Sequence, residues 1–232
     1  MTIAPHQFWQ QLAAAGTYDT APAEGFAEVY PATLPDGRQV LLPIRVLPGG
    51  EDQAVASLIL NQASFVLEDA LADALTAKLK PFAPQVVIGV PTLGLPLAHG
   101  VARRLGHPRM VALGTSRKFW YRDELSEPLS SITTPGHSKR IYLDPRMLPL
   151  LENRRVALID DVISTGSSLS AVLRLLAGCG IEPVVIGCAM LQSRRWEAPL
   201  APWQDRILGV FATPRLVRAP AGGWHPEAQE EA

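Results

Sequence analysis

The sequence predicts one α/β domain whose central parallel sheet is covered by helices on both faces, with a small N-terminal cap. Short runs rich in Val and Ile alternate with helical segments, as in parallel sheets that are buried on both faces. The chain has 232 residues, 47% of them hydrophobic, which is enough for one core. We expect the cap at 1–50, the α/β domain at 51–218 and a disordered tail at 219–232.

Charge and cysteine content limit the class of protein. The formal net charge of -1 argues against a dedicated nucleic-acid binder, which carries a basic excess. Cys179 and Cys188 lack the spacing of a zinc site and fit reduced thiols. The N-terminus lacks the pattern of a signal peptide, and no apolar run approaches the roughly 18 residues that span a membrane. We therefore expect a cytoplasmic protein with neither a nucleic-acid nor a membrane partner.

The N-terminal third is expected to contain two helices and a hairpin. A short helix is predicted at 5–15, and extended runs are predicted at 26–30 and 40–46. Pro35-Asp36-Gly37 separates these runs and is a turn signal, because Pro fixes φ and Gly permits positive φ. Apolar residues recur at three- and four-residue spacing over 51–80, which predicts the longest helix.

The rest of the chain alternates strands with helices. The expected strands cover 86–90, 110–113, 156–159, 184–191 and 207–211. One helix is expected at 95–105, and another follows the strand at 156–159 and extends to about Ala177. This alternation is typical of strands joined by crossover helices in a parallel sheet.

The segment around Asp160 and Asp161 carries the strongest chemical signal. A buried strand leads into these two acids, and the small residues Ser164–Ser168 then open a helix. Backbone N–H groups of such a loop can approach a phosphate closely, and the helix N-terminus adds donors and a positive dipole end. The carboxylates can accept hydrogen bonds from a vicinal diol. The alternative is that the acids and Ser164 or Thr165 merely cap a helix, but the whole string is more specific for a sugar phosphate.

Val156–Ser168 resembles the signature of type I phosphoribosyltransferases that binds 5-phosphoribosyl-1-diphosphate (PRPP), and the order of elements is similar over roughly 85–195. The resemblance implies that Asp160 and Asp161 are the catalytic acids and contact the ribose hydroxyls. It also implies that a phosphate loop binds the 5-phosphate. This loop consists of Ser164, Thr165, Gly166, Ser167 and Ser168. Many relatives have Gly-Thr where this chain has Ser167-Ser168.

Two further segments resemble loops found in members of the same family. Pro91, Thr92, Leu93 and Gly94 resemble the loop that binds diphosphate through backbone amides, here called the diphosphate loop. The basic residue that many relatives have in this loop is replaced by Leu93. The polar stretch Thr115–Tyr142 resembles the flexible hood loop that closes over the site.

Cations in the hood loop are further candidates for the diphosphate site. Arg117 and Lys118 resemble the Arg-Lys pair of adenine-type relatives, which implies contact with diphosphate. The alternative is an ordinary solvated surface loop. The role of Arg194-Arg195-Trp196 also has two interpretations. The segment could form a wall for a flat base or a surface hinge.

The resemblance to adenine phosphoribosyltransferases implies transfer of the 5-phosphoribosyl group from PRPP to a nitrogenous base, with release of diphosphate. A purine, adenine-type, is the favoured base. Magnesium is the expected cofactor, held through PRPP and water rather than by protein ligands. A homodimer is expected. The alternative is a non-catalytic regulator or sensor with the same fold that binds PRPP or a nucleotide.

Overall fold

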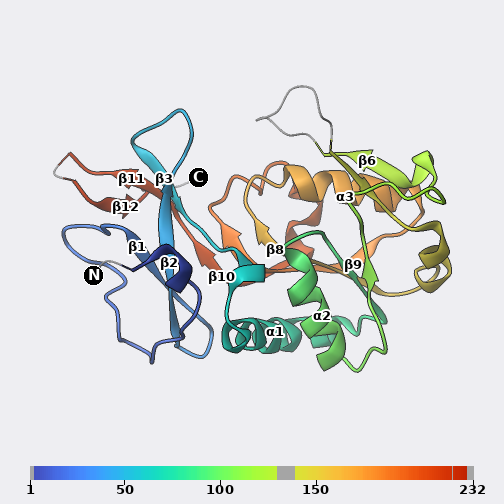
Figure 1. Ribbon diagram of the computed structural model, residues 1–232, viewed down its shortest axis with the longest axis horizontal. Coiled ribbons are helices and arrows are strands. Elements are labelled where there is room, and N and C mark those ends of the chain that lie inside the picture. The colour runs from blue at the N-terminus through green and yellow to red at the C-terminus, as the bar shows by residue number, and fades with distance from the viewer. Residues whose placement is uncertain (1–2, 130–138, 221, 229–232) are drawn as a thin grey trace.

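The computed structural model describes residues 3–129, 139–220 and 222–228, and Figure 1 shows their arrangement around two five-stranded sheets. The central sheet has the order β10-β9-β8-β4-β5, and every neighbouring pair in it is parallel. Its strands are β4 (Val86–Gly89), β5 (Val111–Ala112), β8 (Val156–Ile163), β9 (Pro183–Gln192) and β10 (Ile207–Thr213). The predicted parallel sheet is therefore confirmed.

Helices cover both faces of the central sheet, as predicted. Helices α1 (Phe65–Leu79) and α2 (Gly94–Arg104) lie on one face, and α3 (Ser167–Gly178) lies on the other (Figure 1). Because successive strand residues point to opposite faces, Ala157 packs in the core cluster that contains α1 and α2, whereas Leu158 packs in the cluster that contains α3. The apolar runs of the sequence are thus strands with two buried faces.

The second sheet is antiparallel and has the order β1-β2-β3-β11-β12. Its strands are β1 (Val29–Thr33), β2 (Gln39–Val46), β3 (Gln53–Ala56), β11 (Arg215–Arg218) and β12 (Trp224–Pro226). The predicted N-terminal hairpin is confirmed as β1 and β2. The prediction of a disordered tail is wrong at β12, because Trp224 is 8% exposed and packs with Phe26 and Leu216. Residues 221 and 229–232 of that tail lie outside the described residues.

Two helix predictions were too long. Only Pro5–Gln7 is helical in the first segment, as a 3₁₀ turn, because Phe8 and Trp9 bury their rings in the core and Ala13 pairs with the sheet. In the second segment α1 begins at Phe65, after Ser64, whose hydroxyl accepts from the backbone N–H of Leu67 as an N-cap. Residues 53–56 form β3 instead, since pairing with β2 and β11 overrides their local helical pattern.

The hood loop is partly regular. The 3₁₀ turn Asp123–Leu125 leads to β6 (Ser126–Pro128), which pairs antiparallel with β7 (Arg140–Tyr142). The predicted flexibility of Thr115–Tyr142 stays a prediction, and residues 130–138 of this loop lie outside the described residues. The remaining 3₁₀ turns are Leu60–Gln62, Lys80–Phe82, Pro145–Leu150 and Ala201–Arg206.

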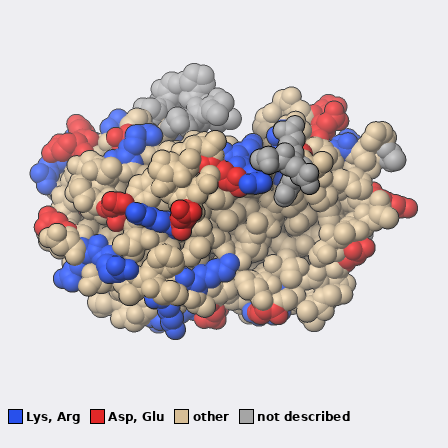
Figure 2. Space-filling model, turned by 180° about the vertical axis from the view of Figure 1, so that it is seen from behind, with Lys and Arg blue, Asp and Glu red and all other residues tan. Residues whose placement is uncertain are grey.

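The surface shows no strong segregation of charge on the face seen in Figure 2, where acidic and basic side chains are interspersed. None of the helices in the described parts of the chain is long and apolar enough to cross a membrane.

Candidate active site

The phosphate loop is a sharp connection between β8 and α3. Gly166 lies at the N-cap of α3 with a φ of 78°, in the left-handed region that glycine adopts without steric cost. A Cβ atom at this position would also lie only 3.0 Å from Cγ of Leu200, so a larger residue would require the Leu200 side chain to shift. The backbone N–H of Ser167 makes only a long contact, at 3.5 Å, with Oγ1 of Thr165. Because N–H groups at a helix start suit an anion, the phosphate site stays a prediction at this position.

Hydroxyl groups surround this helix start, but they are used differently. Thr165 and Ser168 are exposed, and the Oγ1 atom of Thr165 lies 3.0 Å from Oγ of Ser167. In contrast, the Ser164 hydroxyl is used within the protein. It donates to Oε1 of Gln192 at 2.6 Å and accepts from Nη2 of Arg195 at 3.1 Å. The 5-phosphate role predicted for Ser164 therefore depends on its backbone and not on its hydroxyl.

Gln192 is a residue of this site that sequence reasoning missed. It is the last residue of β9 and is 8% exposed. Its Nε2 atom donates to the carbonyl oxygen of Ala56 in β3 at 2.7 Å, while its Oε1 atom accepts from Ser164. Gln192 therefore joins the phosphate loop to the second sheet. The polar residue that ends the apolar run of β9 was the only signal in the sequence.

Asp160 and Asp161 lie inside β8 and not at its end, because the strand extends to Ile163. They are 8% and 9% exposed. Burial raises the pKa of Asp160 well above its usual value, and the neighbouring charge of Asp161 raises it further. Burial also raises the pKa of Asp161. The backbone N–H of Asp161 donates to Oδ1 of Asp160 at 2.9 Å. Hydroxyl donors or a cation would stabilise the charged form of both carboxyl groups. Ribose hydroxyls are such donors, which is consistent with the predicted contact to ribose.

The diphosphate loop lies directly against the first of these acids. Gly94 begins α2, and a Cβ atom built on it would lie 2.8 Å from Cα of Asp160. No side chain fits in that space, so glycine is what allows the two segments to approach. The peptide bond between Pro91 and Thr92 is cis. The fold thus brings the diphosphate loop against Asp160, although Gly94 and Asp160 are 66 residues apart in the sequence.

Arg117 and Lys118 are not placed in contact with either loop. Both are exposed, and Nε of Arg117 pairs with Oδ1 of Asp123 at 3.1 Å. Their predicted role in binding diphosphate therefore stays a prediction. Trp196 is buried, and its Nε1 atom donates to the carbonyl oxygen of Ser193 at 3.0 Å, which favours a structural role over a wall for a base.

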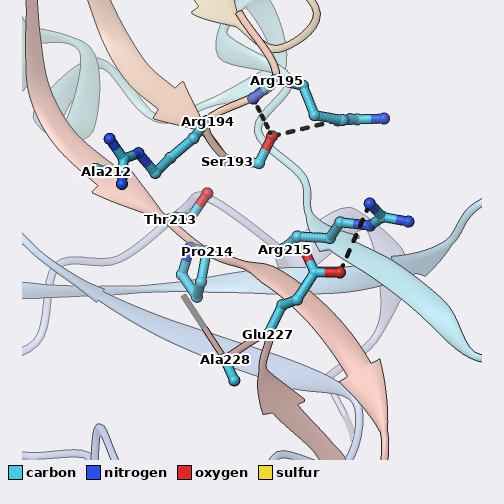
Figure 3. A pocket seen from close by; sticks show the side chains of 9 residues that line it. All are labelled: Ser193, Arg194, Arg195, Ala212, Thr213, Pro214, Arg215, Glu227 and Ala228. Atoms are coloured by element: carbon cyan, nitrogen blue, oxygen red, sulfur yellow. Dashed lines mark hydrogen bonds and ion pairs between the residues drawn. The ribbon is translucent and has the colours of Figure 1, made fainter. Parts of the chain in front are cut away.

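A large cavity lies beside the phosphate loop, at the ends of β9 and β10 and against the second sheet (Figure 3). Its volume is roughly 990 Å³, near the upper end for small-molecule sites. We call it the arginine pocket. Its lining consists of Ser193, Arg194, Arg195, Ala212, Thr213, Pro214, Arg215, Glu227 and Ala228. Arg195 connects this pocket to the phosphate loop through its hydrogen bond to Ser164.

The side chains around Asp160 and Asp161 offer few ligands to a divalent cation. Among the described residues, no group of three or more His, Cys, Asp or Glu side chains could hold a metal ion. The oxygens of Asp160 and Asp161 suit a hard cation such as Mg²⁺, which keeps several waters and shares ligands with a bound phosphate. The residues present thus fit magnesium that arrives with its ligand.

The comparison with protein families agrees with this geometry. The model for the "Phosphoribosyl transferase domain" matches residues 58–210, which is more than half of the chain. The chain belongs to the phosphoribosyltransferase family. It has the type I fold, is adenine phosphoribosyltransferase-like and is an enzyme of the glycosyltransferase class.

The similar proteins within the family carry different functional names. Adenine phosphoribosyltransferase of Frankia alni is 29% identical over 170 residues, which cover 73% of this chain and 81% of the relative. The "Bifunctional protein PyrR" of Synechocystis is 29% identical over 135 residues, or 57% of this chain and 70% of the relative. The structure of APRTase from Giardia lamblia complexed with 9-deazaadenine has a TM-score of 0.57 at 23% identity and covers 73% of this chain and 93% of that one. That structural likeness concerns the fold alone.

Proposed function

We propose that this phosphoribosyltransferase transfers the 5-phosphoribosyl group of PRPP to a ring nitrogen of a nitrogenous base and releases diphosphate. The observation that carries the proposal is the close approach of the diphosphate loop to Asp160, on the strand that leads into the phosphate loop. The phosphate loop follows this residue along β8, and Gly94 of the diphosphate loop packs on its backbone. A ligand with a phosphate at one end, a diol in the middle and a diphosphate at the other end matches this arrangement.

In the proposed reaction the acceptor nitrogen forms a bond to C1 of the ribose as the bond from C1 to the diphosphate oxygen breaks. The bonding electron pair leaves with diphosphate, and the nitrogen loses its proton to solvent or to the leaving group. The enzyme acts by positioning the reactants and by stabilising charge, without a covalent intermediate. The amides at the start of α3 hold the 5-phosphate and so fix the sugar.

Asp160 and Asp161 hold the ribose hydroxyls in this proposal, and their negative charge offsets the positive charge that grows at C1. Their raised pKa values mean that the ligand-free protein holds these charges at a cost. Magnesium, when bound with PRPP, supplies positive charge that neutralises the departing diphosphate. Arg117 and Lys118 are proposed to reach the diphosphate when the hood loop closes.

The relatives' names make purines the first acceptors to test, and adenine is the reference because the match over 170 residues is to an adenine phosphoribosyltransferase. We also propose a homodimer, which size-exclusion chromatography with light scattering would test. Cys179 and Cys188 are free thiols, as suits a cytoplasmic enzyme.

The deciding experiment measures diphosphate release from PRPP and Mg²⁺ with a panel of bases. We expect release that depends on one base and on PRPP together. The variant with both Asp160→Asn and Asp161→Asn should remain folded and lose this activity. Binding of PRPP without turnover on any base would instead identify a PRPP sensor, and failure to bind PRPP would contradict the proposal altogether.

A further inference from the structure

The arginine pocket contains more positive charge than its own carboxylate balances. Its lining holds Arg194, Arg195 and Arg215 but a single acid, Glu227. Nη1 of Arg215 lies 3.7 Å from Oε1 of Glu227, which is long for an ion pair. Arg194 pairs outside the lining with Glu197 at 2.7 Å. In Figure 3 a dashed line joins Arg215 to Glu227, whereas the dashed lines from Arg195 lead to Ser193.

Arg195 is the cation of the pocket that has no carboxylate within ion-pair distance among residues 3–129, 139–220 and 222–228. Its guanidinium donates to the hydroxyls of Ser193 and Ser164 at 3.3 Å and 3.1 Å. Burial and the nearby charge of Arg215 lower the pKa of Arg195. An anion bound between Arg195 and Arg215 would relieve the repulsion between them.

Two buried polar atoms of the lining also lack partners within the described part of the chain. They are Oγ1 of Thr213, a residue that is 3% exposed, and Nε of Arg215. Buried polar groups are almost always hydrogen-bonded in folded proteins, so these two atoms offer hydrogen bonds to a ligand in the cavity. Both can donate, which selects a ligand that brings hydrogen-bond acceptors such as carboxylate oxygens.

The position of the pocket in the sheet indicates which substrate occupies it. In the order β10-β9-β8-β4-β5, the diphosphate loop follows β4 on one side of β8, whereas the pocket lies at β9 and β10 on the other side. With strands about 5 Å apart, the pocket lies roughly 5–10 Å from the line of β8, within reach of a heterocycle attached to the ribose. A nucleophile that displaces diphosphate attacks from the side opposite the leaving group.

We propose that the arginine pocket binds the acceptor, and that this acceptor is a nitrogen heterocycle bearing a carboxylate or similar anionic group held by Arg195 and Arg215. This inference rests on the proposed function and narrows its acceptor. It disfavours a neutral purine such as adenine, because a neutral base would leave the half-buried guanidinium of Arg195 without a counter-ion and Arg215 with the long contact to Glu227 alone.

The first test measures diphosphate release with pairs of probes that differ by one negative charge, namely orotate against uracil and nicotinate against nicotinamide, with adenine as the neutral purine. We expect the charged member of at least one pair to have a kcat/KM higher by about tenfold or more. Equal or better turnover of adenine would overturn the inference and leave the phosphoribosyltransferase activity intact.

The second test uses Arg215→Met, which removes a cation that makes no contact with the phosphate loop. The KM for the anionic acceptor should rise about tenfold or more, while the KM for PRPP changes less than about twofold. The matched control is Arg218→Met on the same strand, whose guanidinium stacks over Trp224 outside the pocket lining. An equal rise in both KM values would assign the arginines to a PRPP phosphate and refute the inference.

A third variant keeps the test valid if Arg215→Met fails to fold. Thr213→Val is nearly isosteric and removes a hydroxyl without a partner in the described residues, so it should not lower the melting temperature. It should still weaken the binding of the anionic acceptor by about threefold to tenfold. If no acceptor is turned over, calorimetric titration of orotate and nicotinate into PRPP-loaded protein tests whether the pocket binds an anionic acceptor. Tight binding that Thr213→Val weakens supports the inference, and absence of binding overturns it, whereas PRPP binding alone reports on the proposed function.

Discussion

The phosphate loop is one run of five residues that follows β8 and includes the first two residues of α3, whereas the arginine pocket takes its lining from the three separate segments 193–195, 212–215 and 227–228. We propose that the loop binds phosphate through backbone amides and small hydroxyls, and such a site follows from local conformation. The arginines of the pocket come together only when β9, β10 and the second sheet are assembled. The proposed donor site is therefore local in the sequence, whereas the proposed acceptor site depends on tertiary structure.

The largest expected effect is at the donor site, next to the phosphate loop. Replacement of both acids, Asp160→Asn with Asp161→Asn, should lower kcat/KM by at least about a hundredfold, because the groups that hold the ribose and stabilise charge at C1 become neutral. Steady-state diphosphate release measures the loss. The exposed Asp36→Asn is the control and should keep full activity. Wild-type turnover by the double variant would remove the acids from the site.

Gly94→Ala tests the close approach between the diphosphate loop and β8. Because the new Cβ would lie 2.8 Å from the Asp160 backbone, the two segments must separate, and kcat/KM for PRPP should fall by about tenfold to a hundredfold. Gly178→Ala is the matched control, since nothing lies within 4 Å of its Cβ. Kinetics with varied PRPP should show normal activity for the control, and a normal Gly94→Ala enzyme would mean that the approach is not needed.

Gln192→Leu tests the link between the two regions. The Ser164 hydroxyl and the Ala56 carbonyl both lose their partner, so the free energy of unfolding should fall by about 1–3 kcal/mol. The phosphate loop also loses its anchor, and the KM for PRPP should rise about tenfold. Gln204→Leu, at an exposed hydrogen bond, is the control. A stability loss with an unchanged KM would limit Gln192 to a structural role.

The smallest effect has the opposite sign and concerns the ligand-free protein. The pKa of Asp160 is raised from 3.8, so the folded state keeps a proton that the unfolded state loses as pH rises. The cost of its buried charge is absent well below pH 3.8 and grows until the pH passes the raised pKa. Asp160→Asn should therefore raise the melting temperature at neutral pH and change it little in acid. A variant that is equally destabilised at both pH values would contradict this explanation.

The sequence was most informative where function depends on neighbours along the chain. Asp160 and Asp161 followed by Ser164–Ser168 predicted a sugar-phosphate site, and the family match and the helix start at Ser167 agree with that prediction. The pattern was misleading at 53–56, where β3 replaces part of a predicted helix because pairing between strands supplies its stability. It also missed Gln192, whose partners lie 28 and 136 residues away.

By itself the sequence determined the alternation of strands and helices, the parallel central sheet and the loop that begins at Ser164. These depend on side-chain periodicity and on local backbone conformation. Only the tertiary structure decided that Gly94 contacts Asp160, that the C-terminal strands complete the second sheet, and that Arg195 and Arg215 share a cavity. Those features depend on contacts between distant segments, which become close only when hydrophobic burial packs the sheets and helices together.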